Sequence, residues 1–285
     1  MKRCDPVIRL YGSHNLKMGT IHPNAVVHEN AQLADDVSVG PNCVVSAGAR
    51  IGSGTTLMAN VVIEPDVVIG TDNLFFPGSV MGATPQILGC GPDAETGRLV
   101  IGNRNTFREH VTVHRSMSPE GITLVGDENL LMIGAHVGHD CILEDKLVIT
   151  NGVHMAGHCK LETGGWVSGL VGMHQFVTLG KWCYIAGHST VGRDVPPYMT
   201  VAGNYPSKVR GINDRGVQRA GLGDARLKSL RKAQRQLYRK GGSLIENAKR
   251  MEEQEGLDPA VHEITDFIAR SATHRFGRYL ELFRQ

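Results

Sequence analysis

Eight of the thirteen histidines lie between positions 110 and 188, and one of them, His139, is followed directly by Asp140. A neutral histidine can remove a proton from an alcohol, and a neighbouring carboxylate favours the imidazolium form that results. A glycine backbone N–H facing the same groove could stabilise an oxyanion. Histidine, carboxylate and glycine together suit the transfer of an acyl group from a thioester to a hydroxyl.

The same histidines allow two other interpretations. His136-x-x-His139 has the look of a pair of metal ligands, and three histidines around an open position hold catalytic zinc, as in a zinc-dependent hydratase. The histidines could also decorate the face of a scaffold without catalytic activity. Metal analysis of the purified protein would separate the zinc interpretation from metal-free acyl transfer.

A six-residue repeat predicts the fold that must position these histidines. Every sixth residue from Ile21 to Met81 is apolar, and the pattern resumes at Ile101 after a break across residues 82–100. Three hexads would make one triangular coil of 18 residues, and coils would stack as parallel strands about 4.8 Å apart. The fifth hexad position is small and inward-facing, and four core cysteines occupy it: Cys43, Cys141, Cys159 and Cys183.

The coil length predicts which side chains lie together. Residues 18 positions apart stack on adjacent coils, about 5 Å from one another. Three columns follow, each running from one coil to the next: His136 and His154; His139, Gly157 and Gln175; Asp140 and His158. We expect their side chains to form one patch.

After about residue 204 the apolar period changes to that of amphipathic helices. One stripe runs from Leu227 to Leu237, a second from Leu244 to Met251, and a third begins at Val261 after Asp258-Pro259. The predicted organisation is an extension (1–20), a β-helix (21–204) with an excursion loop (82–100), and an α-helical domain (205–285).

Composition excludes several classes of protein. The 285 residues include 30 basic and 28 acidic side chains, and the net charge of +2 is unlike that of a histone or an acidic tail. No run of 18 apolar residues could form a transmembrane helix, and the first twenty residues lack the apolar centre of a signal peptide. The six cysteines include no Cys-x-x-Cys pair, so we expect a reduced, cytoplasmic protein.

The chain resembles the bacterial acyl-carrier-protein–UDP-N-acetylglucosamine O-acyltransferases from about Ile21 to the C-terminal helices. The motifs that carry this resemblance are Phe107–Arg115, Asp127–Met132, Ala135–Cys141, Ala156–His158, Met173–Phe176, Asp194–Tyr198, Gly203-Asn204 and Gly211–Asn213 followed by Arg219. The resemblance implies a mainly β fold, a left-handed parallel β-helix with a C-terminal helical domain. It also implies a homotrimer with active sites between subunits, and neither a metal nor an organic cofactor.

The resemblance implies a reaction as well, the first step of lipid A biosynthesis. A 3-hydroxyacyl chain moves from acyl carrier protein to the 3-hydroxyl of UDP-N-acetylglucosamine. His139 would be the general base, Asp140 its supporting carboxylate and Gly157 the donor to the oxyanion. The substrate-binding residues that the resemblance implies are His136, His158, His174, Gln175, Asn213 and Arg219.

Some positions depart from the family's pattern. The family usually carries Gln-Asp-Leu-Lys in the excursion loop, where this chain has Gln86-Ile-Leu-Gly89, and Ala220 replaces the second Arg of an Arg-Arg pair. The missing Asp and Lys contact substrate in the family, so an amino group on a related nucleotide sugar is an alternative acceptor. Tyr184 and Gly187 match positions that set acyl-chain length; a bulky Tyr184 would shorten the groove unless it only packs on the surface.

A basic segment points to the protein partner. From Ser207 to Lys240, eleven Lys and Arg side chains are opposed by two acidic ones, which leaves a charge of +9. Acyl carrier proteins are acidic, and a basic surface would speed their encounter. Nucleic acid is a competing partner for such a surface. Few aromatic residues that could stack on bases lie between these charged residues. We therefore expect the partner to be acyl carrier protein and not nucleic acid.

Overall fold

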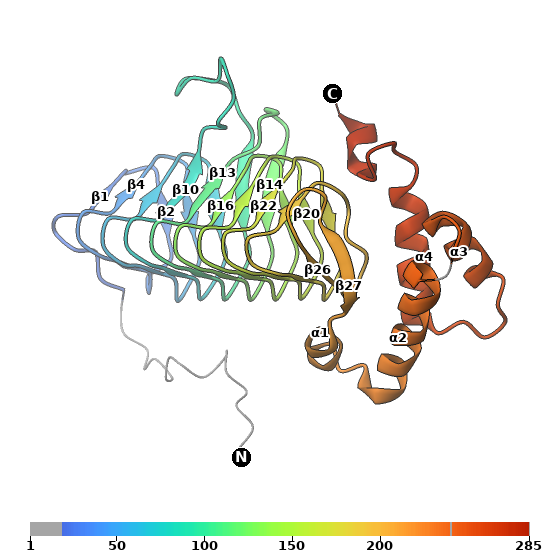
Figure 1. The fold of residues 1–285 in the computed structure, drawn as a ribbon. Coiled ribbons are helices and arrows are strands. Elements are labelled where there is room, and N and C mark those ends of the chain that lie inside the picture. The colour runs from blue at the N-terminus through green and yellow to red at the C-terminus, as the bar shows by residue number, and fades with distance from the viewer. Residues whose placement is uncertain (1–18, 240, 285) are drawn as a thin grey trace.

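The computed structural model describes residues 19–239 and 241–284. The described part is dominated by a stack of short parallel strands in three sheets, the parallel β-helix that the hexads predict (Figure 1). Residues 1–18 of the predicted extension lie outside the described residues. Each coil contributes one strand to each sheet, so corresponding residues of successive coils hydrogen-bond side by side.

The strands form three sheets, and strands that follow one another in each of these sets are neighbours in space. The first sheet contains β1 (Val26–Val27), β4 (Val44–Val45), β7 (Val62–Ile63), β10 (Val80–Ala83), β13 (Thr112–His114), β16 (His136–Val137), β19 (His154–Met155), β22 (Gly172–Met173) and β25 (Thr190–Val191). The second contains β2 (Gln32–Leu33), β5 (Arg50–Ile51), β8 (Val67–Ile69), β11 (Arg98–Ile101), β14 (Ile122–Val125), β17 (Ile142–Leu143), β20 (Lys160–Leu161) and β23 (Thr178–Leu179). The third contains β27 (Lys208–Ile212), β26 (Met199–Ala202), β24 (Tyr184–Ile185), β21 (Trp166–Val167), β18 (Val148–Ile149), β15 (Leu130–Leu131), β12 (Thr106–Phe107), β9 (Leu74–Phe75), β6 (Thr56–Leu57) and β3 (Ser38–Val39).

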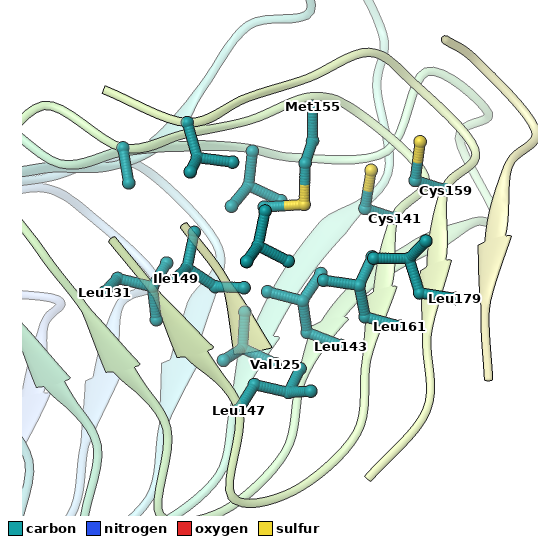
Figure 2. Close-up of a cluster of buried hydrophobic side chains, with 14 of the residues drawn as sticks. Val125, Leu131, Cys141, Leu143, Leu147, Ile149, Met155, Cys159, Leu161 and Leu179 are labelled. Carbon is teal, nitrogen blue, oxygen red and sulfur yellow. The ribbon is translucent and has the colours of Figure 1, made fainter. Parts of the chain in front are cut away.

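The register explains why hexads fold in this way. Most strands have two residues, and successive side chains of a strand point to opposite faces. In β16 and β19, His136 pairs with His154 on the outer face, whereas Val137 pairs with Met155 inside the coil. Figure 2 shows part of the resulting apolar core, including Leu131, Leu143, Leu147, Ile149 and Leu161. The predicted inward cysteines are buried with free thiols: Cys43, Cys141, Cys159 and Cys183.

Two loops leave the β-helix near one another. The excursion loop comprises residues 84–97 between β10 and β11, within the predicted break. Residues 115–121 between β13 and β14 form a shorter insertion, the Ser116 turn. The backbone N–H of Gly97 donates to the carbonyl of Ser116 at 3.0 Å, so the end of the excursion loop is bound to this turn. The insertion also lengthens its coil, because Thr112 pairs with His136, 24 residues further on.

The C-terminal region is helical and packs at the end of the coil (Figure 1). Its elements are α1 (Asp214–Arg219), α2 (Gly223–Arg239), α3 (Leu244–Glu252), α4 (Pro259–Ser271) and the 3-10 helix η1 (Tyr279–Phe283). The three apolar stripes predicted α2, α3 and α4, and the structure confirms these three helices. Glu263 of α4 fastens the helices to the coil, since it accepts hydrogen bonds from Lys181 at 2.7 Å and Tyr198 at 2.6 Å.

Three elements were not expected from the periodicity: α1, η1 and β27, which pairs antiparallel with β26. The division of the chain at residues 20 and 204 stays a proposal. Among the described residues, no helix is both long and apolar enough to cross a membrane.

Candidate active site

His139 and Asp140 lie at the corner between β16 of the first sheet and β17 of the second, the catalytic corner. Asp140 turns the chain with φ of +59°, a left-handed conformation that Asp adopts more readily than most residues. His158 and Phe176 occupy the same corner on the next two coils, with φ of +60° and +66°. The N–H of His158 donates to the carbonyl of His139 at 2.9 Å, which confirms the stacking that the 18-residue coil predicts.

Asp140 orients the imidazole of His139. The Nδ1 atom of His139 and the Oδ2 atom of Asp140 are 2.6 Å apart. An ionised carboxylate can only accept, so Nδ1 donates and Nε2 keeps the lone pair of the neutral ring. Nε2 lies against Gly157, where an added Cβ would stand 2.5 Å from it. No acceptor for the Gly157 N–H is found among the described residues. A basic nitrogen thus lies against a residue whose backbone N–H is unused.

Hydrogen-bond donors hold both oxygens of Asp140. Oδ1 accepts from the hydroxyl of Ser116, and Oδ2 accepts from the backbone N–H of Met117 at 3.1 Å as well as from His139. Burial raises the pKa of Asp140, but the hydrogen bonds from His139, Ser116 and Met117 outweigh it and leave the pKa below its ordinary value. Asp140 is therefore charged at neutral pH and keeps Nδ1 of His139 protonated.

His158 covers the other side of the catalytic corner. Its ring stands nearly perpendicular to that of His139, with centroids 5.0 Å apart, and stacks on Phe176 with centroids 4.5 Å apart. Its Nε2 lies 3.8 Å from Oδ2 of Asp140. Burial lowers the pKa of His158 despite the attraction of Asp140, so the ring is neutral at neutral pH. A neutral, half-buried imidazole can both donate to and accept from a bound polar group.

A second group of histidines lies on the outer face of the first sheet. The ring of His136 is 5.1 Å from that of His114 and 6.3 Å from that of His154. Burial first, and then repulsion from these two histidines, lowers the pKa of His136 to about 4, so it is neutral. Nδ1 of His114 donates to the carbonyl of Thr84 at 2.6 Å, which ties the start of the excursion loop to this group. The sequence pattern predicted no role for His114, although its place in the motif Phe107–Arg115 was a signal.

Known proteins resemble this chain over most of its length. Residues 194–277 match a family described as "Udp N-acetylglucosamine O-acyltransferase; Domain 2", and residues 19–53 match "Bacterial transferase hexapeptide (six repeats)". The acyl-[acyl-carrier-protein]–UDP-N-acetylglucosamine O-acyltransferase of Verminephrobacter eiseniae is 43% identical and aligns with 86% of this chain and 91% of its own. The relative of the same name from Gloeothece citriformis is 40% identical over 72% of this chain and 73% of its own. This chain belongs to the UDP-N-acetylglucosamine O-acyltransferase family.

The fold agrees with solved structures of that acyltransferase family. The UDP-N-acetylglucosamine acyltransferase of Francisella novicida superposes with a TM-score of 0.83 at 35% identity, covering 90% of this chain and 93% of its own. That of Bacteroides fragilis gives a TM-score of 0.83 at 33% identity, covering 88% and 97%. Both the parallel β-helix and the C-terminal helices are therefore features of the family, as the sequence predicted.

His174 and Gln175, to which the acyltransferase resemblance gave substrate-binding roles, lie beside the catalytic corner. They precede Phe176, whose N–H donates to the carbonyl of Gly157 at 3.2 Å. His174 is exposed and Gln175 is half-buried. The placement of Gln175 fits the predicted column with His139 and Gly157, and the roles of both residues remain predictions.

Asn213 and Arg219 lie on another side of the acyltransferase chain. The amide of Asn213 donates to the carbonyl of Trp182 at 2.8 Å, directly before α1. The guanidinium of Arg219 lies over the rings of Trp166 and Trp182, 5.4 and 5.2 Å from their centroids. Trp166 belongs to the third sheet, whereas His139 lies where the first and second sheets meet. One chain alone does not bring Asn213 or Arg219 to His139.

The residues able to hold a metal differ from the predicted pair. One ligand atom each from His139, Asp140 and His158 lies within 4.8 Å of the others, and His136 is not part of this group. The carboxylate of Asp140 already accepts hydrogen bonds on both oxygens, and Nδ1 of His139 donates one of them. The donor set therefore fits an acid–base pair of the acyltransferase better than a zinc centre, whose ligands must be free of protons.

The excursion loop explains the departure from the acyltransferase pattern. Where the family carries Lys, Gly89 has φ of +85°, a conformation that strains any residue with a Cβ. The N–H of Cys90 donates to the carbonyl of Ile87 at 3.0 Å and closes this turn, from which Leu88 projects fully exposed. This turn therefore presents Ile87 and a glycine at the positions where the resemblance leads one to expect Asp and Lys.

Proposed function

We propose that this chain transfers an acyl group from acyl carrier protein to a hydroxyl of UDP-N-acetylglucosamine, with His139 as the general base. Its family membership gives the donor and the acceptor class. The observation that carries the mechanism is the His139–Asp140 pair, whose free Nε2 lies beside Gly157, a residue whose N–H has no acceptor among the described residues. The finer form of the proposal is transfer of a 3-hydroxyacyl chain to the sugar 3-hydroxyl, the first step of lipid A biosynthesis.

The proposed mechanism is a direct attack. Nε2 of His139 takes the proton from the acceptor hydroxyl as the hydroxyl oxygen bonds to the thioester carbonyl carbon. The N–H of Gly157 donates to the oxyanion of the tetrahedral intermediate. The C–S bond then breaks, and the imidazolium of His139 returns its proton to the departing thiolate of the carrier. Asp140 stabilises the imidazolium throughout and is not itself protonated. The site needs no metal or organic cofactor for these steps.

Thiol release from 3-hydroxyacyl-carrier protein tests this function. We expect release that depends on UDP-N-acetylglucosamine, because the acceptor hydroxyl and not water is the nucleophile. Background hydrolysis without the sugar is the control. No sugar-dependent release across several acyl-chain lengths would contradict the proposal.

The excursion loop supports a second candidate with the same donor. Ile87 and Gly89 replace groups that contact substrate in the family, so an amino group of a related nucleotide sugar is the alternative nucleophile. A panel of UDP-amino sugars in the same thiol assay separates the two candidates. Release with an amino sugar and none with UDP-N-acetylglucosamine would favour the second.

We propose a homotrimer because one chain does not complete the site. The outer face of the second sheet, next to the catalytic corner, exposes three large apolar side chains: Ile122, Leu124 and Ile142. Such a stripe marks an interface between proteins. A neighbouring subunit packed on this stripe could bring its own Asn213 and Arg219 to His139, as the family resemblance implies.

Leu124→Glu tests the trimer. The exposed fraction of Leu124 is 37%, and a carboxylate buried at a subunit interface without a partner is strongly unfavourable. We expect the molar mass from light scattering to fall from three chains to one, and acyl transfer to fall at least about tenfold because the shared site is lost. Lys228→Glu, exposed on α2, is the control for assembly. A variant with unchanged mass would contradict the proposed interface.

The basic segment supports acyl carrier protein as the partner. On α2, five basic side chains are exposed: Lys228, Arg231, Lys232, Arg235 and Arg239. Arg231 is paired with Asp214, and the others add positive charge to one surface of the helical region. The free thiols of the described cysteines support a reducing compartment, and we propose that the enzyme acts in the cytoplasm.

A further inference from the structure

We propose that Ser116 is a positioning residue of the reaction, which fixes the carboxylate of Asp140 and through it the imidazole of His139. Its hydroxyl donates to Oδ1 of Asp140 and does not touch the reacting atoms. The proposal rests on the proposed acyl transfer, since it assigns a residue to the same site.

The hydroxyl of Ser116 has its proton directed at Asp140. The side chain is fully buried, so water does not compete for it. Its oxygen accepts the N–H of Ser118 at 3.1 Å, which occupies one lone pair. The other acceptor in reach is the carbonyl of Ser118 at 3.2 Å, a longer contact than the one to the charged carboxylate. Hydrogen bonds to ionised acceptors are shorter and roughly twice as strong, so the single proton goes to Asp140.

The Ser116 turn is held by contacts within the protein that need no substrate. The carbonyl of Ser116 accepts from the N–H of Gly97 at 3.0 Å, and the N–H of Ser116 donates to the carbonyl of Arg98 at 3.4 Å. Gly121 packs so closely that a Cβ there would overlap Oγ of Ser116. The turn therefore presents a preformed pair of donors to Asp140, the Ser116 hydroxyl and the Met117 N–H.

Two donors on different oxygens fix the rotation of the carboxylate. The terminal torsion of an Asp side chain is soft, so a carboxylate held only through Oδ2 can rotate. Rotation would change the angle at which Oδ2 meets Nδ1 of His139, and the position of Nε2 with it. Loss of the Ser116 hydroxyl would also leave Oδ1 without its hydrogen-bond donor. The groups facing Asp140 are His139, His158, Ser116, the Met117 N–H and, at its backbone N–H, Thr123.

Ser116→Ala in the full-length protein is the test, with Ser118→Ala as the matched control in the same turn. For Ser116→Ala we expect kcat to fall about tenfold with KM for UDP-N-acetylglucosamine within about twofold, because a charge-assisted hydrogen bond is lost and no substrate contact is. The fall of kcat at acid pH should begin at a higher pH in this variant. The carboxylate of Asp140 has one hydrogen-bond donor fewer and therefore binds a proton more readily. Ser118→Ala should behave as the wild type. Equal kcat and pH profile for both variants would overturn the proposal.

A double variant separates positioning from damage to the fold. In an Asp140→Asn background, Ser116→Ala should lower kcat less than about twofold further, because its effect passes through the carboxylate. The same tenfold loss in both backgrounds would show a structural role and overturn the proposal. If Ser116→Ala does not fold, Ser116→Cys keeps the size with a weaker donor, and kcat should be lower than the wild type with the same shift of the acid limb.

A spectroscopic measurement keeps this inference apart from the proposed function. In protein with 15N-labelled histidine and no substrate, the Nδ1 proton of His139 should resonate far downfield because of its 2.6 Å hydrogen bond. It should move in Ser116→Ala and not in Ser118→Ala. An unchanged resonance would overturn the role of Ser116 even if transfer occurs, whereas wild-type protein without transfer activity contradicts only the proposed reaction.

Discussion

Replacing His139 with alanine is expected to lower kcat for acyl transfer by roughly 10²–10⁴-fold. The variant loses the nitrogen that takes the hydroxyl proton and returns it to the thiolate, and no other imidazole among the described residues is held by Asp140 at 2.6 Å. The neighbouring His158 is oriented by stacking on Phe176, so it does not replace His139. The measurement is thiol release from acyl carrier protein with both substrates saturating.

The fold should survive this substitution because His139 is a corner residue outside the apolar core. Circular dichroism and thermal melting of His139→Ala should match the wild type within a few degrees. His28→Ala is the matched control, since His28 is an exposed histidine on the first coil, between β1 and β2 and away from the catalytic corner. We expect its kcat to stay within about twofold of the wild type, because surface substitutions away from a site have small effects. A kcat of His139→Ala within tenfold of the wild type would refute the proposed base.

The fold could be predicted from the sequence because its repeat is short and strict. In each two-residue strand the inward side chain must be apolar, so the pattern of Val137, Leu143 and Ile149 specifies the coil length as well as the strands. The same coil length predicts that His139 lies beside Gly157 and Asp140 beneath His158, and the folded chain has both arrangements. Residues 18 positions apart stack in this way wherever no residues are inserted between two coils.

Insertions mark the limit of that argument. Ser116 precedes Asp140 by 24 residues, and the Ser116 turn disrupts the 18-residue count in between. An 18-residue column therefore does not connect the two, and only the folded turn shows the contact. For the same reason the pairing of His114 with Thr84, across the excursion loop, has no counterpart in the hexads.

Asn213 and Arg219 show a different limit. Both were expected at the site, yet within one chain they pack near Trp182 and the third sheet. Periodicity orders residues inside one coil and carries no information on how coils of different subunits pack. The exposed stripe around Leu124 on the second sheet is the feature of a single chain that points to a neighbour.

Replacing Gly157 with alanine is expected to lower kcat about a hundredfold with little effect on stability. Gly157 does not need the backbone freedom of glycine, because its φ lies outside the left-handed region. The substitution acts through a local clash, because an added Cβ would stand 2.5 Å from both Cε1 and Nε2 of His139. Real contacts of this kind are longer, so the ring must shift, and the hydrogen bond from Nδ1 to Asp140 is distorted.

Gly169→Ala isolates this effect. Gly169 also lies at a corner of the β-helix, but its added Cβ would meet its nearest atom, the carbonyl oxygen of Asn151, at an ordinary 3.4 Å. The two variants should melt at similar temperatures, and only Gly157→Ala should lose transfer. The pair therefore measures the contact with His139 rather than the loss of a glycine. If Gly157→Ala kept kcat within about threefold of Gly169→Ala, the attack would not take place on the Gly157 side of the imidazole, and the oxyanion would need another donor.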